Sequence, residues 1–128
     1  MIGASFEEIS WHGDVIYFEF CFHEMADPEW ALEHASTVAA DVVVFDHLPG
    51  SEWIFQGAEE DKVECSWQVL ERAGVRRRQS FVGEQRFRDY GELIAKVGVQ
   101  GPVAIERAQR FRDATNIVIP MRYGLALL

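Results

Sequence analysis

Four side chains that can carry chemistry follow two apolar segments of this sequence. His23 and Glu24 come directly after the first segment, and Asp46 and His47 close the second. A histidine at such a place can serve as a general base near neutral pH, and two histidines with two carboxylates also suit a divalent metal ion. We predict that His23 and Glu24 are catalytic and that Asp46 and His47 contact the substrate.

The same residues also have ordinary structural roles. His23 can cap the entry to a helix, and Asp46 and His47 can make hydrogen bonds within loops. We predict no metal ligand set, because spacing along a sequence gives no ligand geometry. Metal-assisted hydrolysis at His23, Glu24, Asp46 and His47 remains an alternative.

Two buried strands must position these side chains. Residues 15–22 and 41–46 are rich in β-branched and aromatic types, and apolar side chains on both faces are typical of a parallel sheet covered by helices. Asp27 and Pro28, between the two segments, predict the N-cap and first residue of a helix. The order strand, helix, strand indicates a parallel unit. Because ligands bind at the carboxyl ends of strands in open α/β sheets, we expect the four side chains to converge.

The second half of the sequence predicts the remaining elements of an α/β fold. Apolar residues at helical spacing predict helices over 59–73 and 87–97. Residues 102–108 and 116–128 predict two strands joined by a polar turn around 112–115. Since this connection is far too short for a parallel crossover, the two strands should be antiparallel neighbours.

Composition and charge exclude several classes of function. The formal net charge is −9 and the pI is about 4.8, which argues against a nucleic-acid partner. Residues 1–64 hold 15 acidic residues and one basic residue, whereas residues 65–128 hold six acidic and 11 basic residues. This uneven distribution indicates that the two halves pair their charges inside one domain over residues 1–128. No apolar stretch is long enough to span a membrane, and the first residues do not resemble a signal peptide. We therefore expect a cytoplasmic protein without a membrane partner.

The predicted elements resemble the carboxyl-terminal half of the class I SAM-dependent methyltransferases. The resemblance covers essentially the whole chain. Residues 3–9 are similar to the segment that leaves the family's third strand, and residues 14–25, with their His-Glu-Met ending, are similar to its fourth strand. The fifth, sixth and seventh strands resemble residues 41–46, 101–110 and 116–128, in that order. It implies a partial Rossmann-like, mixed four-stranded sheet of order 4-5-7-6. The last strand would be antiparallel and would lie between the fifth and sixth.

This resemblance implies a methyltransferase-like protein that uses S-adenosylmethionine (SAM). Cofactor contacts would come from Ser5, Phe6 and Phe22, and Trp53, after the fifth strand, would contact the substrate. The family holds SAM with a glycine-rich loop after its first strand and an acidic residue after its second, and no such loop occurs in this sequence. We therefore expect this chain not to bind SAM tightly without the other half of the domain.

A half sheet of this kind would have a free edge on its fourth strand, from Tyr17 to Phe22. Such an edge presents unpaired backbone groups and favours association. We expect either a homodimer that covers this edge or a truncated chain whose missing half covers it. A non-catalytic, homodimerising α/β module is therefore the main alternative function.

Overall fold

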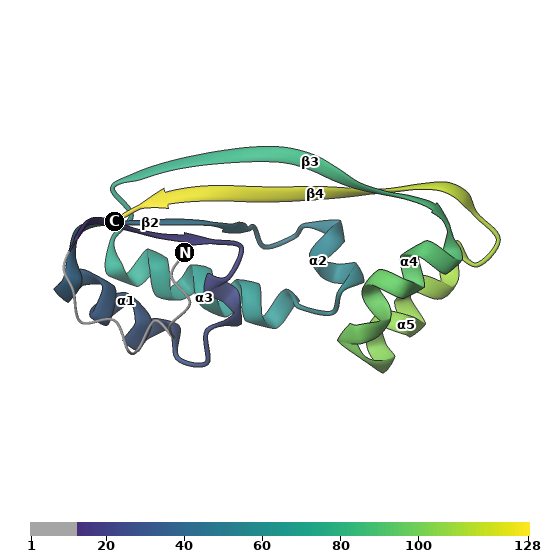
Figure 1. Ribbon diagram of the computed structural model, residues 1–128, viewed down its shortest axis with the longest axis horizontal. Coiled ribbons are helices and arrows are strands. Elements are labelled where there is room, and N and C mark those ends of the chain that lie inside the picture. Colours follow the sequence, from purple (N-terminus) through teal and green to yellow (C-terminus); the bar gives the residue numbers. More distant parts are fainter. Residues whose placement is uncertain (1–12) are drawn as a thin grey trace.

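The computed structural model of this protein describes residues 13–128, which form a mixed four-stranded sheet with flanking helices (Figure 1). The strand order is β1-β2-β4-β3. β1 (Gly13–Glu19) runs parallel to β2 (Ala39–His47), and β4 (Thr115–Leu127) lies antiparallel between β2 and β3 (Arg77–Asp89). The predicted α/β class and strand order are confirmed, because these four strands take the places of the predicted fourth, fifth, seventh and sixth strands.

Two helices cover one face of β1 and β2. α1 (Pro28–Val38) begins as predicted, since the Asp27 carboxylate accepts a hydrogen bond from the backbone N–H of Trp30 at 3.0 Å. α1 and α3 (Glu60–Ala73) pack against the even-numbered residues of β2, including Val42 and Val44, in a first hydrophobic core. Within residues 13–128, no helix has the length and apolarity to cross a membrane.

The predicted position of the sixth strand is wrong. Residues 101–110 contain α5 (Pro102–Ala108) instead, and the strand that pairs with β4 is β3. Pro102 stands at the first helical position, and Ala104 and Ala108, four residues apart, are both fully buried, which is a helical and not an alternating pattern. The polar turn around 112–115 does not join two strands, because α4 (Tyr90–Val97) and α5 lie between β3 and β4.

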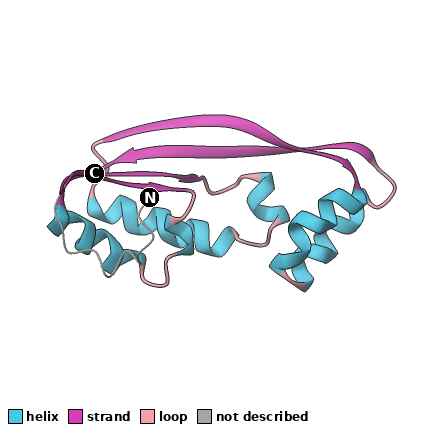
Figure 2. Cartoon of the chain, in the orientation of Figure 1, coloured by secondary structure: helices cyan, strands magenta, loops and turns pink. Residues whose placement is uncertain are grey.

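β3 and β4 form a long ribbon that reaches beyond the first core (Figure 2). At its far end the odd-numbered residues Phe87, Ile117 and Ile119 pack with α4 and α5 in a second core. At its near end the even-numbered Ala126 belongs to the first core. The ribbon thus buries opposite faces at its two ends, as the right-handed twist of a long two-stranded ribbon allows.

An aromatic cluster lies on the face of the sheet opposite to α1 and α3. The ring of Phe45 lies 5.2 Å from that of Tyr123 and 5.8 Å from that of Phe81, and Phe20, just after β1, lies 5.0 Å from Phe45. All four side chains are partly exposed and belong to neither core. On β1 the side chain of Tyr17 is 51% exposed. No helix of residues 13–128 contributes a ring to this cluster.

Candidate functional site

The carboxyl ends of β1 and β2 bring His23 and Asp46 into contact. After β1, Phe20 adopts a left-handed backbone conformation (φ 52°), and the chain then forms a single 3₁₀ turn, Phe22–Glu24, that presents His23. Nδ1 of His23 lies 2.7 Å from Oδ1 of Asp46, and the backbone N–H of His23 donates to Oδ2 at 2.8 Å. Both residues are buried, with Asp46 only 1% exposed.

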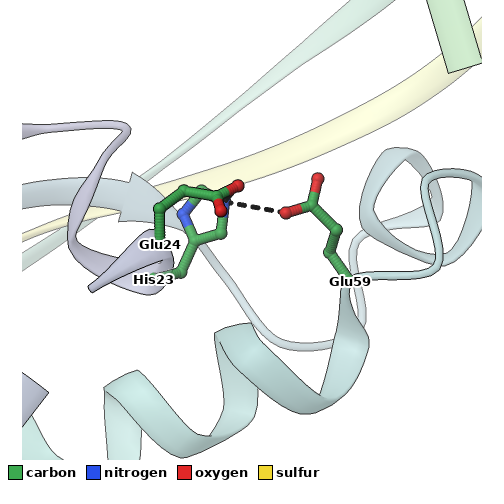
Figure 3. A group of neighbouring side chains, drawn as sticks. All are labelled: His23, Glu24 and Glu59. Atoms are coloured by element: carbon green, nitrogen blue, oxygen red, sulfur yellow. Dashed lines mark ion pairs between the residues drawn. The ribbon is translucent and has the colours of Figure 1, made fainter. Parts of the chain in front are cut away.

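The second ring nitrogen of His23 faces two further carboxylates. Nε2 lies 3.2 Å from Oε1 of Glu24 and 3.2 Å from Oε2 of Glu59. Figure 3 shows Glu59 pointing toward His23 from the start of α3, where Glu59 occupies the N-cap position. The preceding residue, Ala58, is also left-handed (φ 57°). Non-glycine residues in this conformation are strained and gather at functional sites, and here two of them flank one cluster.

Glu59 is the site residue that sequence reasoning missed. An acidic residue at the start of a helix is common, because it interacts favourably with the helix dipole, so its type and position do not single it out. Its approach to His23, 36 positions earlier in the sequence, depends on how α3 packs against the turn after β1. Only the tertiary structure supplies that relationship.

Three carboxylates around one imidazole favour its protonated form. Burial alone lowers the pKa of His23, but the hydrogen bonds and charges of Asp46 and Glu59 outweigh burial and raise the pKa to about 10. The contact with His23 in turn lowers the pKa of Glu59. At neutral pH His23 is therefore an imidazolium that donates from both nitrogens. It can act as a general base only when its carboxylate surroundings change.

His47 lies beside this cluster in a different electrostatic state. Its ring centroid is 5.7 Å from that of His23, and its backbone N–H donates to Oδ1 of Asp46 at 2.8 Å. Burial lowers the pKa of His47, and the neighbouring His23 lowers it further. Its Nδ1 is buried and makes no hydrogen bond with residues 13–128. A neutral imidazole thus stands next to a charged one.

A small cavity of about 210 Å³ adjoins these side chains. Its walls come from the carboxyl ends of β1 and β2, from the start of α3 and from the end of α4: Phe20, His23, Glu24, His47, Trp53, Gly57, Glu59, Lys96, Val97 and Gln100. The cavity is mostly polar and smaller than the pockets that hold drug-sized ligands. It can admit a small group or a few water molecules.

The remaining predicted site residues have separate positions. Trp53, on α2 (Glu52–Gln56), lines the cavity and stacks on Phe87 with ring centroids 5.8 Å apart. Phe22 is 1% exposed and packs in the first core, beneath the site and not on the cavity wall. Ser5 and Phe6 lie outside the described residues.

Residues 13–128 do not by themselves fit SAM. A Rossmann-type cofactor site needs glycines after a strand so that the backbone can approach the ligand closely. In residues 13–128, the loop after β1 holds the bulky Phe20 and Phe22 and the loop after β2 holds a single glycine, Gly50, so neither parallel strand is followed by a glycine-rich turn. The adjoining cavity is also too small for a ligand of that size.

No family model matches this sequence, and no curated protein is significantly similar to it. The fold is similar to the crystal structure of a candidate methyltransferase from Bacillus halodurans C-125, with a TM-score of 0.60 and 12% identity, over 97% of this chain and 68% of that chain. The plantazolicin methyltransferases BpumL and BamL, both solved with SAH and a desmethylPZN analog, give TM-scores of 0.42 and 0.40 at 14% and 12% identity. The alignment covers 98% of this chain and 57% of BpumL, and it covers 94% of this chain and 55% of BamL. TM-scores below 0.5 do not establish a common fold.

Proposed function

We propose that this domain is the acceptor-side half of a SAM-dependent methyltransferase and that a separate polypeptide segment provides the SAM-binding half. The likeness to the Bacillus halodurans protein supports the fold on which this proposal rests. The alignment includes 97% of this chain but only 68% of the Bacillus halodurans chain. The region without a counterpart leaves room for the cofactor-binding segment.

The observation that carries the proposal is the aromatic sheet face together with the edge of β1. Among residues 13–128, β1 pairs only with β2, so its other edge has backbone groups without a strand partner. Phe45, Phe81 and Tyr123 form an apolar face that no described helix covers. Strands with apolar residues on both faces occur in sheets covered by helices on both sides. A second half of the sheet, with its own helices, would cover both the face and the edge.

The cluster around His23 would then face the methyl acceptor. It lies at the carboxyl ends of two parallel strands, where α/β sheets bind their ligands. Three carboxylates surround one imidazolium, so the cluster carries excess negative charge. We propose that Glu24 and Glu59 receive a positively charged group of a small acceptor, with His23, held by Asp46, as the positioning residue. The small polar cavity beside them matches such a group.

The test begins with the DNA upstream of the Met1 codon and in the neighbouring reading frames. We expect a segment there that encodes a glycine-rich loop after a strand. Coexpressed with this chain, it should form a complex that binds SAH in a calorimetric titration, whereas this chain alone should give no saturable heat at millimolar SAH. Saturable binding by this chain alone, or a complex without affinity for SAH, would contradict the proposal.

A homodimeric, non-catalytic module is the second candidate, and the same edge favours it. Val15 and Tyr17 on β1 are each 51% exposed, so a second copy could pair with or cover this strand. Light scattering after size-exclusion chromatography separates the two proposals. A dimer that Tyr17→Lys dissociates would support this candidate, and a stable monomer would exclude it.

The two cysteines favour a reducing compartment. Cys21 and Cys65 are both free thiols, and Cys65 is exposed. Exposed free thiols persist in the reducing cytosol and oxidise readily outside it. We propose a cytoplasmic location on this basis.

A further inference from the structure

We propose that His23, Glu24 and Glu59 bind a divalent first-row transition metal ion. One ligand atom from each residue lies within 4.8 Å of the others, and Nε2 of His23 is 3.2 Å from an oxygen of each glutamate. Bonds of about 2.0–2.1 Å in a tetrahedral arrangement place neighbouring ligand atoms about 3.3 Å apart. The two contacts of Nε2 therefore already have the spacing that a shared metal ion requires. The inference uses the same two glutamates as the proposed acceptor site, but it concerns residues of this chain alone, and its test by metal binding does not require methyl transfer.

The environment of His23 matches that of a metal-binding histidine. Such a histidine usually donates its second ring N–H to a carboxylate, which fixes the tautomer and aims the free nitrogen at the metal. Here Asp46 holds Nδ1 at 2.7 Å and is itself buried and held by two backbone N–H groups, those of His23 and His47. A metal ion would displace the proton on Nε2, and the lone pair so freed would face Glu24 and Glu59, whose oxygens each lie 3.2 Å away.

The Glu59 carboxylate is mostly enclosed and faces the imidazole of His23. Its side chain is only 13% exposed, and its buried Oε2 pairs with Nε2 of His23 at 3.2 Å. The neighbouring Glu24 is paired with the exposed Lys62 at 3.4 Å, and the charge of Lys62 also helps to lower the pKa of Glu59. Two glutamates thus share the single Nε2 proton of His23, and a divalent ion in place of that proton would balance their negative charge better.

The ligand set also indicates the class of ion. One imidazole nitrogen and two carboxylate oxygens suit Zn²⁺, Co²⁺, Mn²⁺ or Fe²⁺ better than Ca²⁺, which prefers six or more oxygens. Three protein ligands leave a coordination position open, as in catalytic zinc sites. The adjoining cavity, lined also by His47 and Trp53, lets a water molecule or a substrate atom occupy that position.

The test uses the chain in a Cys65→Ser background, which removes the exposed thiol as a competing ligand. After treatment with EDTA and dialysis, Zn²⁺ is titrated calorimetrically, and Co²⁺ is titrated with detection of its visible absorption. We expect one ion per chain and a rise in Tm with each metal. Glu24→Gln and Glu59→Gln should each weaken binding at least tenfold. Asp46→Asn should weaken it about 10- to 100-fold, as loss of an outer carboxylate does.

Glu64→Gln is the matched control, because Glu64 is an exposed carboxylate on α3 outside the cluster. It removes the same charge as Glu59→Gln and should leave the affinity unchanged. Circular dichroism verifies that each variant folds, and Glu24, with a side chain 49% exposed, can be replaced without disturbing the core. Absence of saturable binding by the parent chain at millimolar Zn²⁺ would overturn the proposal. Equal affinities for the parent and the Glu24→Gln/Glu59→Gln double variant would overturn it as well.

Discussion

The imidazole of His23 and the carboxylate of Asp46 join the ends of two parallel strands, with Nδ1 and Oδ1 2.7 Å apart. The contact does two things at once. It satisfies a buried carboxylate, and it fixes the ring so that Nε2 faces Glu24 and Glu59. The position of the candidate site and the stability of the strand ends are therefore coupled.

Asp46→Asn should destabilise the chain by about 3 kcal/mol, because it breaks a buried charged pair and leaves the His23 proton without its main acceptor. Urea unfolding followed by circular dichroism measures the change. Asp41→Asn is the matched control on the same strand. Asp41 pairs with Arg76 at 2.8 Å with both side chains about half exposed, so its loss should cost under about 1 kcal/mol. Equal costs for the two variants would show that the Asp46 contact has no special weight.

The stability of the metal-free chain should fall as the pH rises from 6.5 toward 10. The folded-state pKa of His23 is raised to about 10 from 6.5, so the folded chain holds a proton that the unfolded chain has lost. His23 makes its full contribution to the free energy of unfolding below pH 6.5 and loses it as the pH rises through the folded-state pKa of about 10. A single proton limits the slope to about 1.4 kcal/mol per pH unit. Urea midpoints measured in EDTA should show the decline, and His23→Gln should flatten it. A parallel decline in both chains would assign the effect to other groups.

Gly124→Ala should cost about 1 kcal/mol or more, because its Cβ would lie 2.9 Å from Cδ2 of Leu48 and 3.3 Å from Cη2 of Trp67. Gly124 is paired with Asp46 in the sheet, so the strain would act next to the site. Gly98→Ala is the control. Its Cβ would make an ordinary 3.9 Å contact with Ile94, and its φ of −59° suits alanine, so stability should hold or rise by about 0.5 kcal/mol. Thermal unfolding of both variants checks the contrast.

Arg107 should matter more than the other surface arginines, because it ties α5 to α2 and α3. Its guanidinium donates to the Phe55 carbonyl at 2.7 Å, pairs with Glu60 at 2.7 Å and lies over the Phe55 ring. Arg107→Ala should cost about 1.5 kcal/mol, the value of one hydrogen bond from a charged group. Arg88→Ala, which removes an exposed pair with Glu92, should cost much less than Arg107→Ala because solvent screens that pair. Chemical denaturation measures both, and a reversed order would contradict this role for Arg107.

The first part of the fold could be predicted because its signals are strong and local. Residues 15–22 and 41–46 are apolar on both faces, and Asp27 and Pro28 mark the helix between them. β3 could not be predicted in this way. It is an edge strand of mostly exposed residues, many of them charged, so it lacks the apolar pattern of a buried strand.

The candidate site was predictable only in part. The rule that ligands bind at the carboxyl ends of strands brought His23, Glu24, Asp46 and His47 together, and the structure places all four at one end of the sheet. Glu59 and Lys96 reach the cavity from helices that are far away in sequence. Their positions follow from how α3 and α4 pack, which no local pattern in the sequence encodes.

Hydrogen exchange of the β1 amides tests the central claim most directly. In this chain alone, the amides on the free edge of β1 should exchange quickly. In the complex with the glycine-rich segment, those of residues 15–19 should become protected as a new strand pairs with this edge. Protection confined to α4 and α5, or exchange along β1 that the segment leaves unchanged, would contradict the claim that this domain is one half of a larger methyltransferase sheet.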